Sequence, residues 1–533
     1  MPHERGACLF RAGLRRVRRD GRGKFRRWMS LHGGRRGLGR RIMPAGAFSL
    51  NGKEDRMRLP ANKTKIVCTI GPASDSPDVL QRMILAGMNI ARLNFSHGDF
   101  EGHARVVENI RKAARAAGRR VSIMADLPGP KIRIGQLAQE PIELNSGDAF
   151  TLTTEKIVGG IERVFVSFPP LTEVVKPGDR LFLNDGQIEL EAERVQGLDV
   201  RCRVVVGGEL RSRKGLNLPR IDLGISAFTP HDHNCLRFAA EQGLDAVSQS
   251  FVETAEDLRA VRRAAAEIDY NPFIIAKIER AGALDRIDEI LDVADGLMVA
   301  RGDLGVEIPI ERIAAVQKRL TNKANQRCKP VITATQMLLS MVANRRPTRA
   351  EATDVANAIL DGTDCVMLSE ESAMGKYPVE AVAMLAGIAF SIEPLLPAWP
   401  LRDTLKSVSG HCELTPAELI ALSVEATLER VTPAAVFVPT HGGNTARSIA
   451  RFRFPVWVVA VSSKEATCRG LQFSYGVCPV REDDHPDDWK QYTRAWLDAH
   501  ELEGSLTVVT EGPSSKHPEV NNRMEIIRLR EEA

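Results

Sequence analysis

The sequence predicts a (β/α)8 TIM barrel with a small β domain inserted into it and an α/β domain towards the C-terminal end. Eight short apolar runs alternate with helical segments between residues 64 and 373, as a barrel of parallel strands with crossover helices requires. Residues 131–219 interrupt this alternation with strand-like runs and contain no convincing helix. The Pro-rich stretch 393–400 precedes a further set of alternating segments.

These observations divide the chain into four parts. We expect an Arg-rich disordered head over 1–60, a barrel over 61–130 and 220–395, an inserted small β-barrel domain over 131–219 and a C-terminal α/β domain over 412–533. A domain above the mouth of a barrel is well placed to act as a lid.

Helix signals separate the predicted barrel strands. Ser76-Pro77 combines a capping residue with the proline favoured at the first helical position. A second helix spans 100–117 and ends at Gly118. The predicted strands lie at 64–72, 88–98, 121–129, 245–251, 272–279, 295–305, 329–337 and 364–373.

Turn signals organise the other two domains. In the insertion, strand-like runs are joined by Gly-Asp and Asp-Gly turns and cover 142–154, 177–195 and 199–206. The C-terminal domain reads as an α/β layer structure. Its predicted order is a helix over 415–431, a strand over 434–439, a loop and helix over 440–452, and strands over 456–462, 504–512 and 524–529.

The formal net charge of +5 combines two parts of opposite sign. Residues 1–43 hold 13 Arg and one Lys against one Glu and one Asp, whereas the rest of the chain has 59 basic and 66 acidic residues. The mildly acidic body therefore predicts no nucleic-acid partner. The head is open to three interpretations: sequence upstream of a true start at Met43 or Met57, a transit peptide with few hydroxyl residues, or an arm that contacts phosphate backbones.

Cysteine usage and hydropathy indicate the compartment. The nine cysteines form no CxxC pair and show no zinc-ligand spacing. Their odd number in a large chain predicts reduced thiols and a cytoplasmic location. Because no apolar run of about 18 residues is evident, we expect no membrane span and no membrane partner.

Polar side chains gather at the C-terminal ends of the predicted barrel strands. In a barrel this end is the catalytic face, so a shared site explains the whole set better than separate capping or solvated residues do. The set comprises Arg92, Asn94, Ser96, His97, Asp126, Lys277, Glu279, Gly302, Asp303, Thr335, Gln336 and Glu371.

Two of these carboxylates suggest a metal site. Lys277 and Glu279 project to the same side of one strand, and Asp303 follows the next strand. Glu279 and Asp303 can hold a hard divalent cation such as Mg²⁺, although a salt-bridge set with Lys277 explains the pair equally well. A metal with Arg and Lys clamps suits phosphoryl transfer, where positioning and charge neutralisation provide most of the catalysis.

The sequence resembles the pyruvate kinase family over most of residues 62–393. The matching stretches, in the family order, are TKIVCTIGPAS (64–74), ARLNFSHG (91–98), GPKIRIG (129–135), NDGQIEL (184–190), RKGLNLP (213–219), AKIE (276–279), VARGDLGVE (299–307), ATQMLLSM (334–341), PTRAEATDVANAILDGTDCVMLSEESA (347–373) and GKYPVEAV (375–382). The resemblance implies a phosphotransferase that converts phosphoenolpyruvate and ADP to pyruvate and ATP, the last step of glycolysis.

The resemblance also implies roles for site residues. Arg92 would bind the substrate phosphoryl group and Lys277 would stabilise it during transfer. Glu279 and Asp303 would hold Mg²⁺ or Mn²⁺, and the amides near Gly302 and Asp303 would hold the substrate carboxylate. Thr335 would orient a proton-relay water, because a threonine is too weak an acid to be the ultimate donor. The nucleotide-side positions are Asn94, His97, Arg133 and Lys214.

One departure from the family pattern concerns the monovalent cation. Many members bind K⁺ at the positions that are here Asn94, Ser96, Asp126 and Leu127, with a Thr in place of Leu127 and a Glu in place of Lys131. A fixed Lys131 ammonium would stand in for K⁺ and repel it. We therefore expect activity without K⁺; the alternative is that Lys131 faces solvent in the hinge of the lid.

The C-terminal domain matches the effector and oligomerisation domain of the family. Its predicted effector loop, Thr440-His441-Gly442-Gly443-Asn444-Thr445, could cradle a phosphate with its amides and with Thr440, Gly442, Gly443 and Thr445. Because His441 and Asn444 replace the familiar Lys or Arg, a sugar monophosphate or AMP is the better expectation than a bisphosphate; a plain connecting loop is the alternative. A homotetramer is implied by the resemblance alone.

The sequence argues against three other classes of function. Other barrel enzymes that use phosphoenolpyruvate need a phosphohistidine carrier, and no such domain is evident. A catalytically dead paralogue would lack contact residues, yet Arg92, Lys277, Glu279, Asp303 and Thr335 are all present. An RNA- or membrane-associated role through the head is disfavoured by the acidic body.

Overall fold

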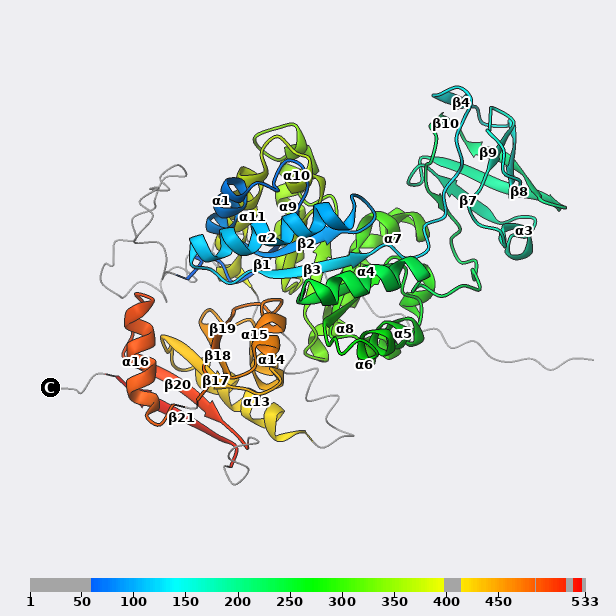
Figure 1. Cartoon of the computed structure of the whole chain (residues 1–533). Helices are drawn as coiled ribbons and strands as arrows, with labels where there is room; N and C mark the ends of the chain where they lie inside the picture. Colours follow the sequence, from blue (N-terminus) through cyan, green and yellow to red (C-terminus); the bar gives the residue numbers. More distant parts are fainter. Residues whose placement is uncertain (1–58, 397–413, 485, 514–520, 530–533) are drawn as a thin grey trace, which may run out of the picture. The chain divides into compact units, whose positions relative to one another are not determined.

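The computed structural model describes residues 59–396, 414–484, 486–513 and 521–529. The predicted head over 1–60 lies outside the described residues, apart from its last two positions. In the described part, eight parallel strands close into the predicted barrel, in the order β1-β16-β15-β14-β13-β12-β3-β2 (Figure 1). The strands are β1 (Lys65–Thr69), β2 (Met88–Asn94), β3 (Ser122–Leu127), β12 (Ala246–Gln249), β13 (Phe273–Ile278), β14 (Gly296–Ala300), β15 (Val331–Ala334) and β16 (Cys365–Leu368).

The barrel helices begin and end where local chemistry satisfies their free backbone groups. Ser76 caps the first helix by accepting from the Val79 amide, and Gly118 ends the second at φ 61°, as predicted. The helices are α1 (Pro77–Ala86), α2 (Phe100–Ala117), α4 (Pro230–Glu241), α5 (Ala255–Ala266), α6 (Ile287–Val293), α7 (Arg301–Glu307), α8 (Ile313–Gln326), α9 (Arg349–Leu360), α10 (Glu370–Ala373) and α11 (Pro378–Ile392).

The inserted domain is built from strands, as expected from its turn signals. A six-stranded sheet runs in the order β11-β7-β8-β9-β5-β6, beside a two-stranded sheet of β10 and β4. Asn184 and Asp185 adopt positive φ in the predicted Asp-Gly turn between β7 and β8. The elements are β4 (Ile142–Leu144), β5 (Ala149–Thr153), β6 (Arg163–Phe165), α3 (Leu171–Val174), β7 (Arg180–Leu183), β8 (Ile188–Gln196), β9 (Asp199–Val206), β10 (Gly208–Leu210) and β11 (Leu216–Asn217).

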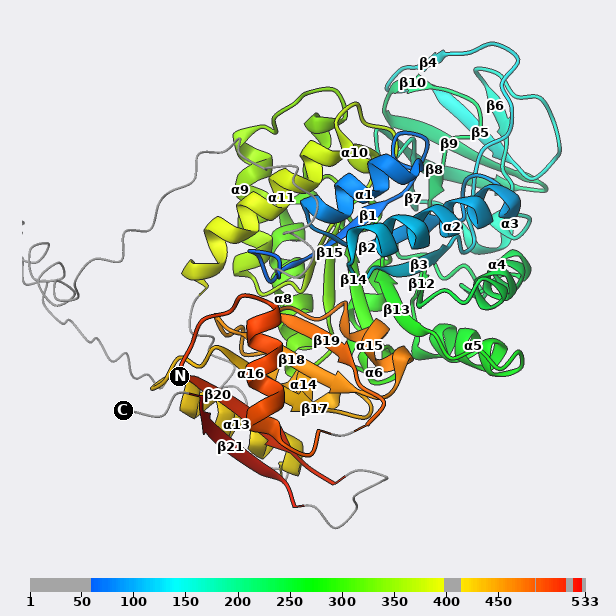
Figure 2. The ribbon, with the colours of Figure 1, turned by 60° about the vertical axis from the view of Figure 1, so that its left-hand side comes forward.

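The C-terminal domain is a five-stranded sheet with helices on both faces (Figure 2). Alternate residues of its strands pack with α13, α14 and α15 on one side and with α16 on the other. Its strand order is β19-β18-β17-β20-β21, with only β21 antiparallel to its neighbour. The elements are α13 (Pro416–Leu428), β17 (Ala435–Pro439), α14 (Asn444–Ala450), β18 (Trp457–Ser462), α15 (Glu465–Leu471), β19 (Val477–Arg481), α16 (Trp489–Ala499), β20 (Leu506–Glu511) and β21 (Arg523–Arg528).

The C-terminal domain contacts the barrel at the N-terminal ends of the strands. Phe473 is fully buried among the side chains that fill the barrel interior, and its ring stacks on Phe273, the first residue of β13, at 5.3 Å. Beside it, Arg453 forms a buried ion pair with Asp364, which precedes β16. This end of the barrel is opposite to the end where active sites form.

Contrary to the expectation that no such segment exists, one helical stretch, Pro378–Leu395, is long and apolar enough to be a candidate membrane span. It comprises α11 and the short turn after it, and α11 packs against α1, α9 and β1. A single stretch of this kind is weak evidence, because core helices of non-membrane proteins pass the same test.

Candidate functional site

The C-terminal ends of β2, β3 and β13 bring four predicted side chains together in a buried cluster. Arg92 donates to Asp126 through Nε at 3.1 Å and through a second, shorter contact, and it donates to Thr69 at 2.8 Å. Lys277 Nζ lies 3.3 Å from the Asp126 carboxylate and 2.8 Å from that of Glu279. All four side chains are at least nine-tenths buried. We call Arg92, Asp126, Lys277 and Glu279 the catalytic cluster.

The charges of the cluster fix its protonation states. Burial would raise the pKa of Asp126, but Arg92 and Lys277 hold it well below its usual range. Burial would lower the pKa of Lys277, but Asp126 and Glu279 outweigh burial and raise it. An ionised Asp126 therefore holds two permanent cations side by side, both directed to the strand ends where an anionic substrate would lie.

Glu279 differs from Asp126. Burial, reinforced by the nearby Asp303 charge, raises the pKa of Glu279 to about 7, although Lys277 opposes the shift. Its Oε2 accepts the Phe251 amide at 2.7 Å. Glu279 and Asp303 suit a divalent cation by ligand type, since Mg²⁺ takes one or two carboxylates and completes its shell with water and substrate oxygens. Within the described residues, no group of three or more His, Cys, Asp or Glu is arranged to hold a metal.

The ends of β14 and β15 contribute a second group, at Gly302 and Thr335. The Gly302 amide, in the first turn of α7, donates to Thr335 Oγ1 at 2.8 Å. Thr335 has φ 70°, an unusual conformation for a β-branched residue. Arg301 donates to the Thr335 carbonyl at 2.8 Å and pairs with Asp354. The strained backbone is thus held in place, with the Thr335 hydroxyl beside the amides of α7.

The predicted cation pocket contains an ammonium group. Lys131 Nζ donates to Ser96 Oγ at 2.7 Å, and the Ser96 amide donates to Asn94 Oδ1 at 3.1 Å. Burial, Lys277 and Arg133 lower the pKa of Lys131, while Asp126 and Asp303 oppose the shift. Leu127 is fully buried at the end of β3.

The predicted nucleotide-side residues lie in the barrel and at the hinge of the inserted domain. The backbone of Arg133 forms an isolated β-bridge with that of Gly215, and the Ile134 amide donates to the Lys214 carbonyl at 2.9 Å. These contacts place Arg133 and Lys214 on adjoining backbones. His97 is largely exposed, but partial desolvation of its ring and the charges of Lys131 and Arg133 lower its pKa, which favours the neutral ring at pH 7.

The predicted effector loop contains a hydrogen bond between two of its own residues. Thr440 Oγ1 accepts the Gly443 amide at 2.9 Å, and Gly443 has φ 86°. Arg447, in the helix that follows, donates to the Gly442 carbonyl at 3.2 Å. Arg447 therefore brings a cation beside the loop. Because Arg447 lies outside residues 440–445, the loop sequence alone does not indicate this cation.

Two serines that hydrogen-bond to the catalytic cluster are not among the predicted site residues. Ser248 donates to Asp126 at 2.6 Å, and Ser250 accepts from Lys277 Nζ at 2.6 Å. Both lie at the end of β12 with the two-residue spacing of one strand face, the same signal that singles out Lys277 and Glu279. Glu371, predicted at the rim, is buried and accepts the Leu338 and Ser369 amides, so its place in the structure is that of a backbone support.

Comparisons with known proteins agree with this geometry. The family model of the pyruvate kinase barrel domain matches residues 61–382, and that of the pyruvate kinase alpha/beta domain matches residues 418–527. A pyruvate kinase from Thermococcus litoralis is 47% identical over 441 residues, covering 80% of this chain and 90% of that protein. One from Geobacillus stearothermophilus is 43% identical over 458 residues, covering 84% and 77%. The crystal structure of a pyruvate kinase from Cryptosporidium parvum superimposes with a TM-score of 0.82 at 34% identity, covering 90% of this chain and 98% of that one.

Proposed function

Because the chain belongs to the pyruvate kinase family, which transfers the phosphoryl group of phosphoenolpyruvate to ADP and so forms pyruvate and ATP, we propose that the catalytic cluster carries out this transfer. One observation supports the assignment most strongly: Asp126 holds the cations of Arg92 and Lys277 side by side at the strand ends. Arg92 binds the phosphoryl group in the ground state. Lys277 stabilises the charge that develops during transfer. A lactate-dehydrogenase-coupled assay of pyruvate formation tests this.

Glu279 and Asp303 are the residues that would hold Mg²⁺ or Mn²⁺. When bound, the cation would supply positive charge to neutralise the phosphoryl oxygens during transfer. The substrate carboxylate meets the amides of Gly302 and Asp303 at the start of α7. The Thr335 hydroxyl, 2.8 Å from the Gly302 amide, orients the water that delivers a proton to the methylene carbon.

The raised pKa of Glu279 predicts a pH-dependent metal requirement. A carboxylate must lose its proton before it binds a cation, and the pKa of this group is raised to about 7. We expect the Mg²⁺ concentration for half-maximal activity to rise as the pH falls from 8 to 6, by up to about tenfold per unit below the pKa. Mg²⁺ titrations of the coupled assay at both pH values measure it. Equal half-saturation at the two pH values would contradict this role of Glu279.

ADP would bind between the barrel and the hinge of the inserted domain. Asn94, His97, Arg133 and Lys214 are the residues proposed to contact it. Arg133 and Lys214 lie on adjoining backbones, so both cations can approach the same polyphosphate. A neutral His97 can hydrogen-bond the nucleotide without adding charge.

The Lys131 ammonium predicts activity without K⁺. The Lys131 side chain is exposed, and the 2.7 Å contact of its Nζ with Ser96 Oγ supports a cation beside the proposed pocket. We expect the wild-type enzyme to have the same activity, within about twofold, in tetramethylammonium and in K⁺ buffers. Lys131→Glu should lose most activity in tetramethylammonium and regain it with KCl. A wild-type enzyme that itself needs KCl would contradict the proposal.

The effector loop is proposed to bind a sugar monophosphate or AMP in a homotetrameric, cytoplasmic enzyme. The free thiols of the described residues agree with a reducing compartment. Arg447 offers the loop one guanidinium, which suits one phosphate better than two. We expect ribose 5-phosphate or AMP to lower the half-saturating phosphoenolpyruvate concentration more than fructose 1,6-bisphosphate does. If no compound shifts this concentration, the loop is only a connection.

A further inference from the structure

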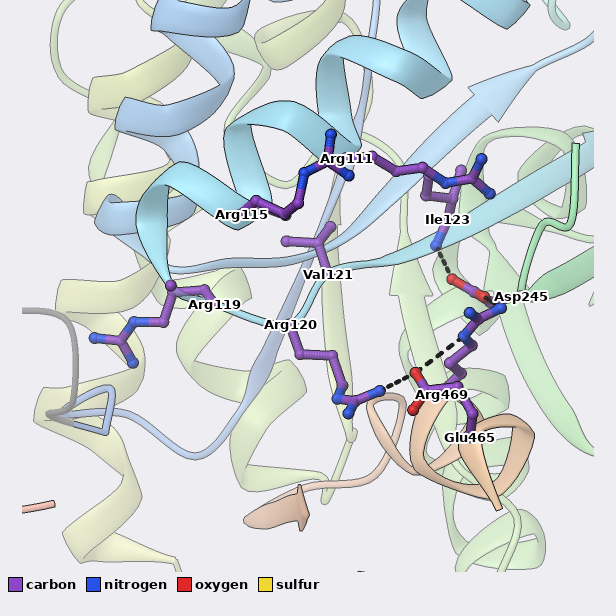
Figure 3. A pocket seen from close by; sticks show the side chains of 11 residues that line it. Arg111, Arg115, Arg119, Arg120, Val121, Ile123, Asp245, Glu465 and Arg469 are labelled. Atoms are coloured by element: carbon purple, nitrogen blue, oxygen red, sulfur yellow. Dashed lines mark hydrogen bonds and ion pairs between the residues drawn. The ribbon is translucent and has the colours of Figure 1, made fainter. Parts of the chain in front are cut away.

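A second concave site lies away from the catalytic cluster, between the C-terminal half of α2, the start of β3 and α15 (Figure 3). Its volume is about 380 Å³. Arginines line most of it, and no residue of the catalytic cluster or the effector loop takes part. The charged lining residues are Arg111, Arg115, Arg119, Arg120, Asp245, Glu465 and Arg469.

Two of these arginines join the barrel to the C-terminal domain. Arg120, just before β3, pairs with Glu465 of α15. Arg469 lies 3.1 Å from Glu465 and 3.0 Å from Asp245, which precedes β12. Asp245 in turn accepts the Ile123 amide of β3 at 2.8 Å. Each of the two carboxylates thus has two hydrogen-bonding partners. Because a guanidinium has five N–H donors, Arg120 and Arg469 have more donors than these contacts use.

The other two arginines come from α2. Arg111 donates to the carbonyl oxygens of Gln242 and Gly243. Arg115 is exposed and forms no ion pair within the described residues. In Figure 3 the Arg119 side chain extends away from Arg120, and the Arg115 guanidinium points away from Asp245 and Glu465. Apart from Arg119, four arginines and two carboxylates line the hollow, an excess of two positive charges.

We propose that this arginine pocket binds a phosphate monoester in its dianionic form. A monoester carries close to two negative charges at neutral pH, which matches the excess, and guanidinium forks bind phosphate oxygens in pairs. The volume is within the range of small-molecule sites. An adjoining hollow of about 520 Å³ shares Arg111 and Arg115 and continues along α2 past Arg105. It gives room for a sugar or nucleoside, so an ester fits the surface better than free phosphate.

Calorimetric titration of the full chain in Mg²⁺-free buffer tests the proposal, with inorganic phosphate, ribose 5-phosphate and AMP as separate ligands. Arg115→Glu is the main variant, because Arg115 is exposed and has no ion-pair partner to orphan. Lys112→Ala, on the same helix but outside the pocket, is the matched control. Thr445→Ala tests the effector loop. The midpoint of thermal unfolding checks that each variant is folded.

We expect ribose 5-phosphate or AMP to bind, and Arg115→Glu to weaken that binding by about tenfold or more, the usual effect of losing a charge-assisted hydrogen bond. Lys112→Ala should leave it unchanged. Because the effector loop is proposed to bind the same esters, Thr445→Ala should remove only the loop's own binding event, and the event that Arg115→Glu weakens should remain. The ester that binds more tightly identifies which group occupies the adjoining hollow. An identical isotherm for wild type and Arg115→Glu, loss of all ester binding in Thr445→Ala, or equal affinity for inorganic phosphate would each overturn the proposal.

Discussion

Replacing Lys277 with alanine is expected to lower kcat by about 10³-fold. Lys277 is a buried cation that contacts both carboxylates of the cluster, at 3.3 Å from Asp126 and 2.8 Å from Glu279. Removing one preorganised group that stabilises transition-state charge costs about 10²–10³ in kcat, and here a full charge is lost in a site from which water is excluded. The half-saturating phosphoenolpyruvate concentration should change much less, because Arg92 stays paired with Asp126. Steady-state kinetics by the coupled assay separate the two effects.

Lys277→Arg serves as the conservative control. It keeps the charge but not the position, because Nζ is held by Ser250 at 2.6 Å in a buried site with little room for a guanidinium. We expect its kcat to lie between those of the wild type and Lys277→Ala. If kcat of Lys277→Ala stays within about threefold of the wild type, Lys277 does not act in the transfer.

Replacing Arg453 with methionine is expected to lower the free energy of unfolding by about 3–5 kcal/mol, the usual cost of leaving a buried charge unpaired. Arg453 donates to both oxygens of Asp364 at 2.8 and 2.9 Å, and also to Asn325. Both side chains are over nine-tenths buried where the barrel meets the C-terminal domain. Urea unfolding at a fixed protein concentration measures the change.

A double variant separates the lost charge from lost packing. Arg453→Met with Asp364→Asn removes both charges, so it should recover part of the stability that Arg453→Met loses. Arg105→Met removes an exposed pair with Glu101 on α2 and should have no measurable effect. If Arg453→Met lowers the free energy of unfolding by less than about 1 kcal/mol, or if the double variant is less stable than the single one, the ion pair does not stabilise the contact between the barrel and the C-terminal domain.

The barrel was predictable because its strands are short apolar runs with helix caps between them. The family resemblance then assigned the residues at the strand ends. Ser248 and Ser250 are two residues apart and therefore lie on one face of their strand. The same spacing rule applied to residues 245–251 predicts that both contribute to the site. The domain boundaries and the site roles stay predictions.

Several elements of the structure were not predicted from the sequence, among them the short strands β6, β10 and β11 and the short helices α7 and α10, which were included in predicted strands. β19 contains Pro479, which argues against a strand but is tolerated at the edge of the sheet, where β19 lies. α3 and α15 have four and seven residues, too few to establish a helical period. α16 does carry a signal, since Trp489, Thr493 and Trp496 share its buried face. That signal was readable and was missed.

The contact between domains could not be predicted from local pattern. Phe473 fills the barrel interior from a different domain, and nothing near it in sequence indicates which domain it packs against. The arginine pocket is similar, because it combines α2 and β3 with α15, which lies more than 300 residues further along the chain. Only tertiary structure brings these charges together.

The most direct test of the account is the coupled assay of the wild-type chain with phosphoenolpyruvate, ADP and Mg²⁺ in tetramethylammonium buffer free of K⁺. We predict pyruvate formation at the rate seen with KCl, and its near disappearance in Lys277→Ala. Activity only after addition of KCl would contradict the role of Lys131. No pyruvate formation with or without KCl would contradict the catalytic role of the whole cluster.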